Sequence, residues 1–158
     1  MAYSTIEFCA GNAMPSLLGV FTLPIRSAIA FDKRSRKRRW DLVQRFTYAN
    51  HDIYDPYVDT IIKGISSKNI MIAMHPCSQL AVRVIELFNK SKAEYLLLCP
   101  CCNGGVSGDI ANQFRYLNLS KYDLWTAHLA NMCQGQHVKV VKDEHNVSSK
   151  NNLIIVRR

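Results

Sequence analysis

The cysteines near residue 100 are the densest group of potentially reactive side chains in the sequence. Cys99, Cys101 and Cys102 stand in LCPCCNGG, directly after an apolar run and before a pair of glycines. Thiols this close together could bind a metal ion, form disulfides or act as nucleophiles. A zinc or iron–sulfur site needs four converging ligands, and the adjacent Cys101 and Cys102 are expected to point in different directions. The pattern therefore predicts no metal site.

Candidates for catalysis follow two apolar runs. His75 and Cys77 stand in MHPCS, and Cys101 stands in LCPCC. A thiolate near a helix N-terminus is activated, so Cys77 and Cys101 are candidate nucleophiles. His75 could act as a base or orient a substrate, or it could be a hydrogen-bonded core histidine. Residues 1–11 lack a signal-peptide pattern, so we expect a reducing, intracellular setting in which most of the six cysteines simply pack as free thiols.

Two aspartates could hold a nucleoside. The small-residue turn CAGNAMPS leads from an apolar run into a helical pattern, so its backbone can approach a ligand closely. Asp32 stands 21 positions after Gly11, near the spacing at which an acid accepts hydrogen bonds from ribose hydroxyls. Asp52 could reach an adenine amine or cap the turn that follows it. The first turn has no Lys or Arg for a phosphate, which favours S-adenosylmethionine over a nicotinamide dinucleotide, the cofactor of an alternative oxidoreductase.

Seven short apolar runs are predicted strands, and they must position these residues. They cover residues 4–8, 28–31, 46–49, 69–74, 94–98, 137–141 and 152–156. Helical spacing lies between the first five, most clearly over 78–91, where Ser78 can serve as N-cap, and again over about 109–134. The alternation predicts an α/β fold in one domain, 1–158: a doubly wound, mostly parallel seven-stranded sheet with a C-terminal antiparallel hairpin. Since ligands bind beyond the carboxyl ends of such strands, the candidate residues should share one edge.

Basic residues concentrate in one block. Six of the seven residues in KRSRKRR, 33–39, are Lys or Arg, in a chain whose net charge is +8. The block follows the predicted strand 28–31 on the expected ligand edge, so it could engage the phosphates of RNA. A solvated helix start and a nuclear-localisation-like signal are the alternatives. The candidate nucleic-acid contacts are Lys33, Arg34, Arg36, Lys37, Arg38 and Arg39.

These motifs resemble class I S-adenosylmethionine-dependent methyltransferases. Glu7, Cys9, Gly11 and Ala13 fall on the acid and the three glycines of the family's first motif; Asp32 fits the second motif, HDI the third and MHPC the fourth. The chain is most similar to a poorly characterised branch with CAGNG, H-x-C-G and PCC blocks. Cys9 and Ala13 replace glycines, and each added side chain is expected to narrow the approach to the methionine part of the cofactor. The resemblance implies these cofactor-binding residues: Glu7, Cys9, Gly11, Asn12, Asp32, Lys33, Asp52, Ile53 and His75.

The resemblance and the basic block together predict a methyltransferase that acts on rRNA or tRNA. The alternative is an inactive methyltransferase-fold component or assembly factor of a ribonucleoprotein, such as a mitochondrial ribosome, or a chain that relies on a specificity subunit. We expect a cytoplasmic protein, with a nuclear or mitochondrial location as alternatives. The sequence has no run of about 18 apolar residues, so no membrane association is expected.

Overall fold

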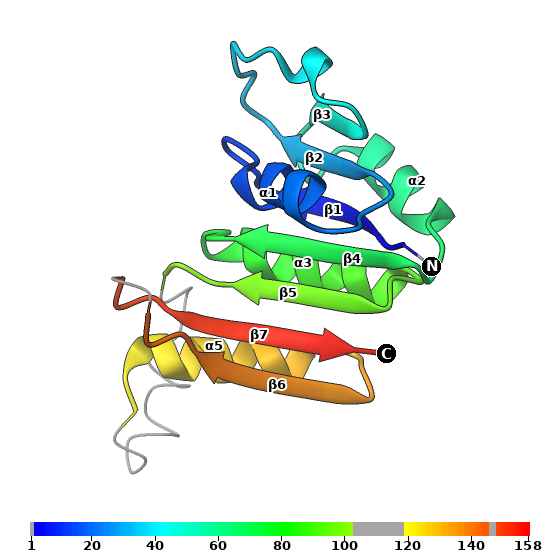
Figure 1. Cartoon of the computed structure of the whole chain (residues 1–158). Coiled ribbons are helices and arrows are strands. Elements are labelled where there is room, and N and C mark those ends of the chain that lie inside the picture. Colours follow the sequence, from blue (N-terminus) through cyan, green and yellow to red (C-terminus); the bar gives the residue numbers. More distant parts are fainter. Residues whose placement is uncertain (1, 103–118, 146–147) are drawn as a thin grey trace.

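The structure, a computed structural model, describes residues 2–102, 119–145 and 148–158. In these residues one seven-stranded sheet has the order β3-β2-β1-β4-β5-β7-β6 (Figure 1). β1 to β5 are parallel, and β7 pairs antiparallel with both β5 and β6. This confirms the predicted doubly wound sheet with its closing hairpin, and every strand lies within one residue of its predicted bounds. The strands are β1 Ser4–Phe8, β2 Ala28–Asp32, β3 Phe46–Asn50, β4 Asn69–Met74, β5 Tyr95–Cys99, β6 His137–Lys142 and β7 Asn152–Arg157.

The helices alternate with the parallel strands, as predicted. α1 spans Met14–Thr22, α2 Pro56–Gly64, α3 Gln79–Lys90 and α5 Lys121–Met132, and a short 3-10 helix, η1, spans Trp40–Leu42. α2 begins at a proline, and the Asp55 side chain accepts a hydrogen bond from the Tyr57 N–H, which is a standard N-cap. α3 has an apolar face that is buried against the sheet.

Two helix starts differ from the prediction. The helix expected over 109–134 begins at Lys121, because the Ser120 hydroxyl accepts a hydrogen bond from the Asp123 N–H and caps it there; residues 109–118 lie outside the described residues. Ser78 occupies the N-cap position of α3, but its side chain makes no capping hydrogen bond, so that prediction was wrong. Its φ of 48° and ψ of −117° hold the Ser78 N–H toward the Cys102 sulfur instead.

The helices cover the sheet unequally. α2, α3 and α5 lie against one face, and α1 lies on the other, over β1 and β2 (Figure 1). The larger core fills the space beneath α2, α3 and α5, and a smaller core of Ala13, Val20, Ala28, Ala30 and Phe46 lies beneath α1. Among the described residues, no helix is long and apolar enough to cross a membrane.

Candidate functional site

A cavity of about 260 Å³ opens at the carboxyl edge of β1 to β4. This edge includes the point where the strand order reverses between β1 and β4, which is where doubly wound sheets bind ligands. Seven of the nine residues predicted to bind a cofactor line this cavity: Cys9, Gly11, Asp32, Lys33, Asp52, Ile53 and His75. The other two, Glu7 and Asn12, do not line it. The other lining residues are Phe31, Arg34, Arg36, His51 and Leu80.

The turn between β1 and α1 contributes Cys9 and Gly11 to the cavity lining. Cys9, Gly11 and Ala13 all have left-handed backbones, with φ of 53°, 55° and 52°. Glycine adopts such angles freely, whereas an L side chain costs roughly 1–2 kcal/mol there. A Cβ atom added at Gly11 would meet no atom within 4 Å, so the backbone at Gly11 borders open space. The two non-glycine residues keep the glycine-like conformation of the motif, so both substitutions leave the turn intact.

Cys9 and Ala13 affect the cavity differently. Cys9 is half-buried and lines it, and burial, followed by the nearby Asp32 carboxylate, raises the pKa of the Cys9 thiol to about 12. Ala13 is fully buried in the small core beneath α1. The expectation that Ala13 narrows the cofactor approach was therefore wrong, because its methyl group packs into the core.

Asp32 connects the turn to the basic block. Its Oδ2 accepts a hydrogen bond from the Gly11 N–H at 2.8 Å, and its Oδ1 accepts one from the Arg34 N–H at 2.8 Å. Tyr48 on β3 holds the same two segments, since its hydroxyl contacts the carbonyl oxygens of Gly11 and Arg34, each at 3.1 Å. Each carboxylate oxygen retains a second lone pair for a ligand hydroxyl. Asp32 is thus placed both to shape the cavity and to accept hydrogen bonds inside it.

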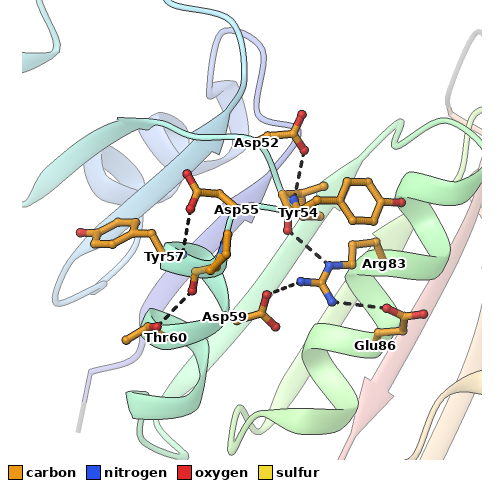
Figure 2. A network of polar contacts seen from close by, with 10 residues as sticks. Asp52, Tyr54, Asp55, Tyr57, Asp59, Thr60, Arg83 and Glu86 are labelled. Carbon is orange, nitrogen blue, oxygen red and sulfur yellow. Dashed lines mark hydrogen bonds and ion pairs between the residues drawn. The ribbon is translucent and has the colours of Figure 1, made fainter.

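The loop that carries Asp52 and Ile53 is held by a buried arginine (Figure 2). Arg83 on α3 is 8% exposed; its Nε donates to the Ile53 carbonyl oxygen at 3.3 Å, and its guanidinium pairs with Asp59 on α2. The Asp52 carboxylate accepts a hydrogen bond from the Tyr54 N–H at 3.0 Å, the turn-capping role that was the alternative for this residue. Asp52 also lines the cavity, so this capping role leaves its predicted ligand role open.

Glu7 lies beneath the turn. It is 1% exposed, and its Oε2 accepts a hydrogen bond from the Ser16 N–H at 2.9 Å. Ser16 lies in the first turn of α1, whose N-cap residue Ala13 has no side chain that could cap it. Burial raises the pKa of Glu7, and the hydrogen bond from Ser16 opposes that shift. The geometry therefore gives Glu7 a structural role in fixing the start of α1.

The basic block forms an irregular loop at the rim of the cavity. It connects β2 to η1 and is the cyan segment that projects beyond β2 in Figure 1. The alternative of a helix start is therefore wrong. Lys33, Arg34 and Arg36 line the cavity, whereas Lys37 and Arg38 are exposed and do not. Arg39, the remaining basic residue of the block, is also exposed and forms an ion pair with Asp41 at 2.7 Å.

A family model described as a methyltransferase domain matches residues 11–109. The matched segment is more than half of the chain and contains every residue that lines the candidate cavity except Cys9. The chain belongs to this methyltransferase family. A comparison with curated proteins found no match.

Solved structures with the same fold include RNA methyltransferases. One is Sp1610 of Streptococcus pneumoniae, a putative tRNA (m1A22) methyltransferase, with a TM-score of 0.58, 14% identity, and 99% of this chain and 64% of that chain covered. TrmK of M. capricolum, in complex with S-adenosyl-homocysteine, matches with a TM-score of 0.54 and 10% identity; the match covers 99% of this chain and 62% of that chain. A 16S rRNA (adenine(1408)-N(1))-methyltransferase from Catenulisporales acidiphilia matches with a TM-score of 0.53 and 12% identity; the match covers 98% of this chain and 83% of that chain. This chain thus spans less than two thirds of the length of the first two.

The candidate catalytic residues lie beside one another at the ends of β4 and β5. His75 is exposed and lines the cavity, so the alternative of a core histidine was wrong. The Cys77 and Cys101 sulfur atoms are 3.0 Å apart, and neither residue lines the cavity. Burial, followed by a hydrogen bond with Cys77, raises the pKa of Cys101 to about 12. A thiol with so high a pKa stays protonated at neutral pH, which does not favour a nucleophilic role.

The thiols converge where the sequence predicted that they would not. The sulfur atoms of Cys77, Cys101 and Cys102 all lie within 4.8 Å of one another. The expectation that Cys101 and Cys102 point in different directions was wrong, because the chain bends at Cys102 and both sulfurs approach that of Cys77. All six cysteines are free thiols, as expected.

Several residues of the site were missed by sequence reasoning. His51 follows β3 within the same short NHDI segment as Asp52, so its position at the strand end could have indicated it. Tyr48 and Arg83 act through contacts 37 and 30 residues away in sequence, and no local pattern marks them.

Proposed function

We propose that this chain is an S-adenosylmethionine-dependent methyltransferase that acts on RNA. One observation carries the proposal: Asp32, the proposed ligand of the ribose hydroxyls, lines the same cavity as Lys33, Arg34 and Arg36 of the basic loop. A nucleoside-binding acid and a phosphate-binding rim are thereby adjacent. An RNA acceptor also implies an intracellular location.

The residues of the cavity fit this cofactor. The Gly11 backbone borders open space, which allows close approach of a ligand. Asp32 has free lone pairs for two ribose hydroxyls, and Asp52 lies at the end of the neighbouring strand, β3, where an adenine amine could reach it. Phe31, Ile53 and Leu80 provide the apolar walls that a purine ring needs. The cavity volume is close to the lower end of the roughly 300–1,000 Å³ typical of ligand sites.

When bound, S-adenosylmethionine supplies a methyl group on a positively charged sulfur. The protein must then hold the acceptor atom in line with that methyl group, and positioning alone can provide most of the rate enhancement. His75 is exposed on the cavity wall at the end of β4, where its imidazole can accept a proton from an acceptor nitrogen or oxygen. No described residue other than His75 and His51 offers an imidazole at this cavity.

The basic loop is suited to a long, phosphate-bearing acceptor. Lys37 and Arg38 are exposed and, unlike Arg39, make no ion pair with a described acidic residue. Each Lys or Arg that neutralises a phosphate releases a counterion, so affinity for RNA should fall steeply with salt. The tRNA and rRNA methyltransferases among the structural neighbours support the choice of RNA over a protein or small-molecule acceptor.

The first test measures cofactor binding. Thermal denaturation with S-adenosylhomocysteine at about 100 times its Kd should stabilise the fold by roughly 2.7 kcal/mol, a clearly visible rise in Tm. ATP serves as a matched nucleoside control and should give no comparable shift. An unchanged Tm with millimolar S-adenosylhomocysteine would remove the cofactor assignment and favour a fold that serves only as a ribonucleoprotein component.

The second test measures RNA binding and methyl transfer with the double substitution Lys37→Ala and Arg38→Ala. Arg36 is left intact because it lines the cavity. If both side chains engage single-stranded phosphates, the slope of log K against log salt should shrink by about 1.4, or about 0.7 per contact. Methyl transfer to bulk RNA should fall, while affinity for S-adenosylhomocysteine stays unchanged because neither exposed side chain lines the cavity.

The matched control removes two lysines elsewhere. Lys90→Ala and Lys92→Ala make the same change in charge at the end of α3, at the opposite edge of the sheet from the cavity. This control should keep the RNA affinity and salt slope of the unmodified protein. If both double variants behave alike, the basic loop is not the RNA contact. If RNA binds normally but no methyl group is ever transferred, the protein is a ribonucleoprotein component and the enzymatic proposal fails.

A further inference from the structure

Three cysteine sulfurs gather at one corner of the sheet, outside the cavity. Cys77 lies in the turn between β4 and α3, and Cys101 and Cys102 directly follow β5. The three sulfur atoms lie within 4.8 Å of one another, and those of Cys77 and Cys101 are 3.0 Å apart. Cys77 is exposed, and the other two are half-buried. The cluster is therefore compact and open to an ion from solvent.

We infer that Cys77, Cys101 and Cys102 form a binding site for a zinc ion. Thiolate sulfur is a preferred ligand of Zn²⁺, and Zn–S bonds are about 2.3 Å long. Three sulfurs arranged tetrahedrally about one ion are therefore about 3.8 Å apart. The Cys77 and Cys101 sulfurs are 3.0 Å apart, and no two of the three sulfurs are more than 4.8 Å apart, so small side-chain rotations can bring them to this spacing.

The backbone around Cys77 supports a built site. His75 and Ser78 both have positive φ, 60° and 48°, although neither is glycine. Such strained conformations persist only where the surrounding structure enforces them, and they cluster at ligand-binding and active sites. Together they turn the segment 75–78 so that the Cys77 sulfur faces the end of β5.

A backbone donor holds the Cys102 sulfur in place. The Ser78 N–H donates a hydrogen bond to the Cys102 sulfur at 2.9 Å. Ser78 immediately precedes the twelve-residue helix α3, so this contact ties the Cys102 sulfur to the start of that helix. Hydrogen bonds to ligand atoms of this kind orient metal ligands and tune their basicity.

Three protein ligands leave the fourth position open. Within the described parts of the chain, no histidine or carboxylate joins the three sulfurs at this distance. A three-ligand zinc ion keeps a water molecule, or another small ligand, in its fourth position. Binding replaces the three thiol protons, which pass to the buffer.

The consequence of zinc binding is local rigidity beside the cavity. Cys77 and Cys101 are 24 residues apart, so the ion would cross-link the β4–α3 turn to the end of β5. His75, which lines the cavity, lies two residues from Cys77. The ion would therefore fix the turn that presents His75, and it would stabilise the folded state because a preformed site is absent from the unfolded chain.

The test is a zinc titration of reduced, chelator-treated protein without cofactor or RNA, so its outcome is independent of the proposed enzyme activity. We expect one zinc per chain, a rise in Tm, and an intense thiolate-to-metal absorption band when cobalt replaces zinc. Cys102→Ser should weaken zinc binding by more than the roughly 10–100-fold caused by changes in residues that only orient ligands. Cys133 is a half-buried thiol at the end of α5 and outside the cluster, so the variant Cys133→Ser should bind zinc normally.

Cys77→Ser keeps the test decisive if Cys102→Ser fails to fold, because Cys77 is exposed and a serine there disturbs no core contact. Absence of zinc binding by the reduced protein, or equal losses in Cys77→Ser and Cys133→Ser, would overturn the proposal. So would a disulfide between Cys77 and Cys101 that forms in air while the reduced protein binds no zinc, since the pair would then be a redox couple.

Discussion

The two sides of the sheet's carboxyl edge carry different chemistry. On the β2–β3 side, Asp32, Asp52 and Asp55 each accept hydrogen bonds from the backbone, mostly from residues two positions further along the chain. On the β4–β5 side, the cysteine sulfurs contact one another and groups 24 residues away. The carboxylate side is thus organised mainly by local turns, and the thiol side by long-range packing. The first arrangement leaves readable marks in a sequence, and the second does not.

The largest loss of unfolding free energy should come from Arg83→Met, which removes contacts only from the carboxylate side. The change leaves the Ile53 carbonyl and Asp59 without their partner. Removing one member of a buried pair typically costs about 3–5 kcal/mol, and we expect about 2–3 here because the Asp59 side chain is 27% exposed. Urea unfolding measures this loss, and S-adenosylhomocysteine affinity should fall with it.

Glu86→Gln is the matched control for Arg83. Glu86 also contacts Arg83, at 3.4 Å, but its side chain is 47% exposed, so the pair should contribute under about 1 kcal/mol. Zinc binding should be unaffected in both variants. A loss of zinc affinity in Arg83→Met would show that the two sides of the edge are coupled, which would break the comparison.

Asp32→Asn should have the next largest effect and should act on cofactor binding. Hydrogen bonds to a charged group contribute about 1.5–3 kcal/mol, and the amide retains one acceptor oxygen, so we expect a loss of about 1.5–2 kcal/mol, or roughly 10- to 30-fold in Kd. Alanine would be a poorer test, because Asp32 also holds the N–H groups of Gly11 and Arg34. Isothermal titration with S-adenosylhomocysteine measures the change.

Asp41→Asn provides the comparison for Asp32. Asp41 is an exposed acid that pairs with Arg39 and does not line the cavity. The substitution Asp41→Asn should leave cofactor affinity unchanged. Equal affinities for Asp32→Asn and the unmodified protein would remove the ribose-binding role from Asp32.

The fold was predictable because its signals are local. Each strand is an apolar run of four to six residues, and the helices between them carry apolar faces at helical spacing. Placing candidate residues at one edge then required only the rule that ligands bind at the carboxyl ends of parallel strands. The failures, at Ser78 and at residue 120, occurred where long-range contacts or a single cap decide the start of a helix.

The thiol corner could not be predicted in the same way. Cys99 and Cys102 have the C-x2-C spacing, which indicates a zinc site only when a second such pair or two histidines accompany it. In the structure, however, Cys99 is buried and its sulfur contacts the Lys150 carbonyl oxygen at 3.8 Å. Cys77 takes the third place in the cluster, and only the pairing of β4 with β5 brings it there.

A smaller effect is expected from Glu7→Gln, which tests a buried carboxylate beneath the cavity. Burial raises the folded-state pKa of Glu7 above its unfolded value. The folded state therefore holds the Glu7 proton more tightly, and the wild-type protein loses stability as pH rises from the unfolded pKa through the folded pKa. Glutamine can still accept the Ser16 hydrogen bond but carries no charge.

Glu7→Gln should therefore match the wild type in stability near pH 4 and be more stable at pH 7. Denaturant unfolding across this pH range measures the difference. The exposed Glu144→Gln should not alter the pH dependence. A variant that is less stable than the wild type at pH 7 would show that the Glu7 charge is needed at the start of α1.

The smallest effect on stability is expected at the first turn, from Cys9→Gly. Glycine relieves about 1–2 kcal/mol of left-handed strain. It also loses about 0.5–1 kcal/mol through greater freedom of the unfolded chain, and some buried side-chain area. The net change in unfolding free energy should be within about 0.5 kcal/mol. Since the pKa of the Cys9 thiol is about 12, its removal changes no charge at pH 7.

Cys9→Gly and Ala13→Gly together separate strain from access. Both relieve a positive φ, but only Cys9 lines the cavity, whereas Ala13 is buried in the small core. Cys9→Gly should therefore tighten S-adenosylhomocysteine binding severalfold in calorimetry, and Ala13→Gly should leave it unchanged. If both tighten it equally, the flexibility of the turn limits cofactor entry. If Cys9→Gly weakens it, the sulfur contacts the ligand directly, and the thiol chemistry extends from the β4–β5 corner into the carboxylate side.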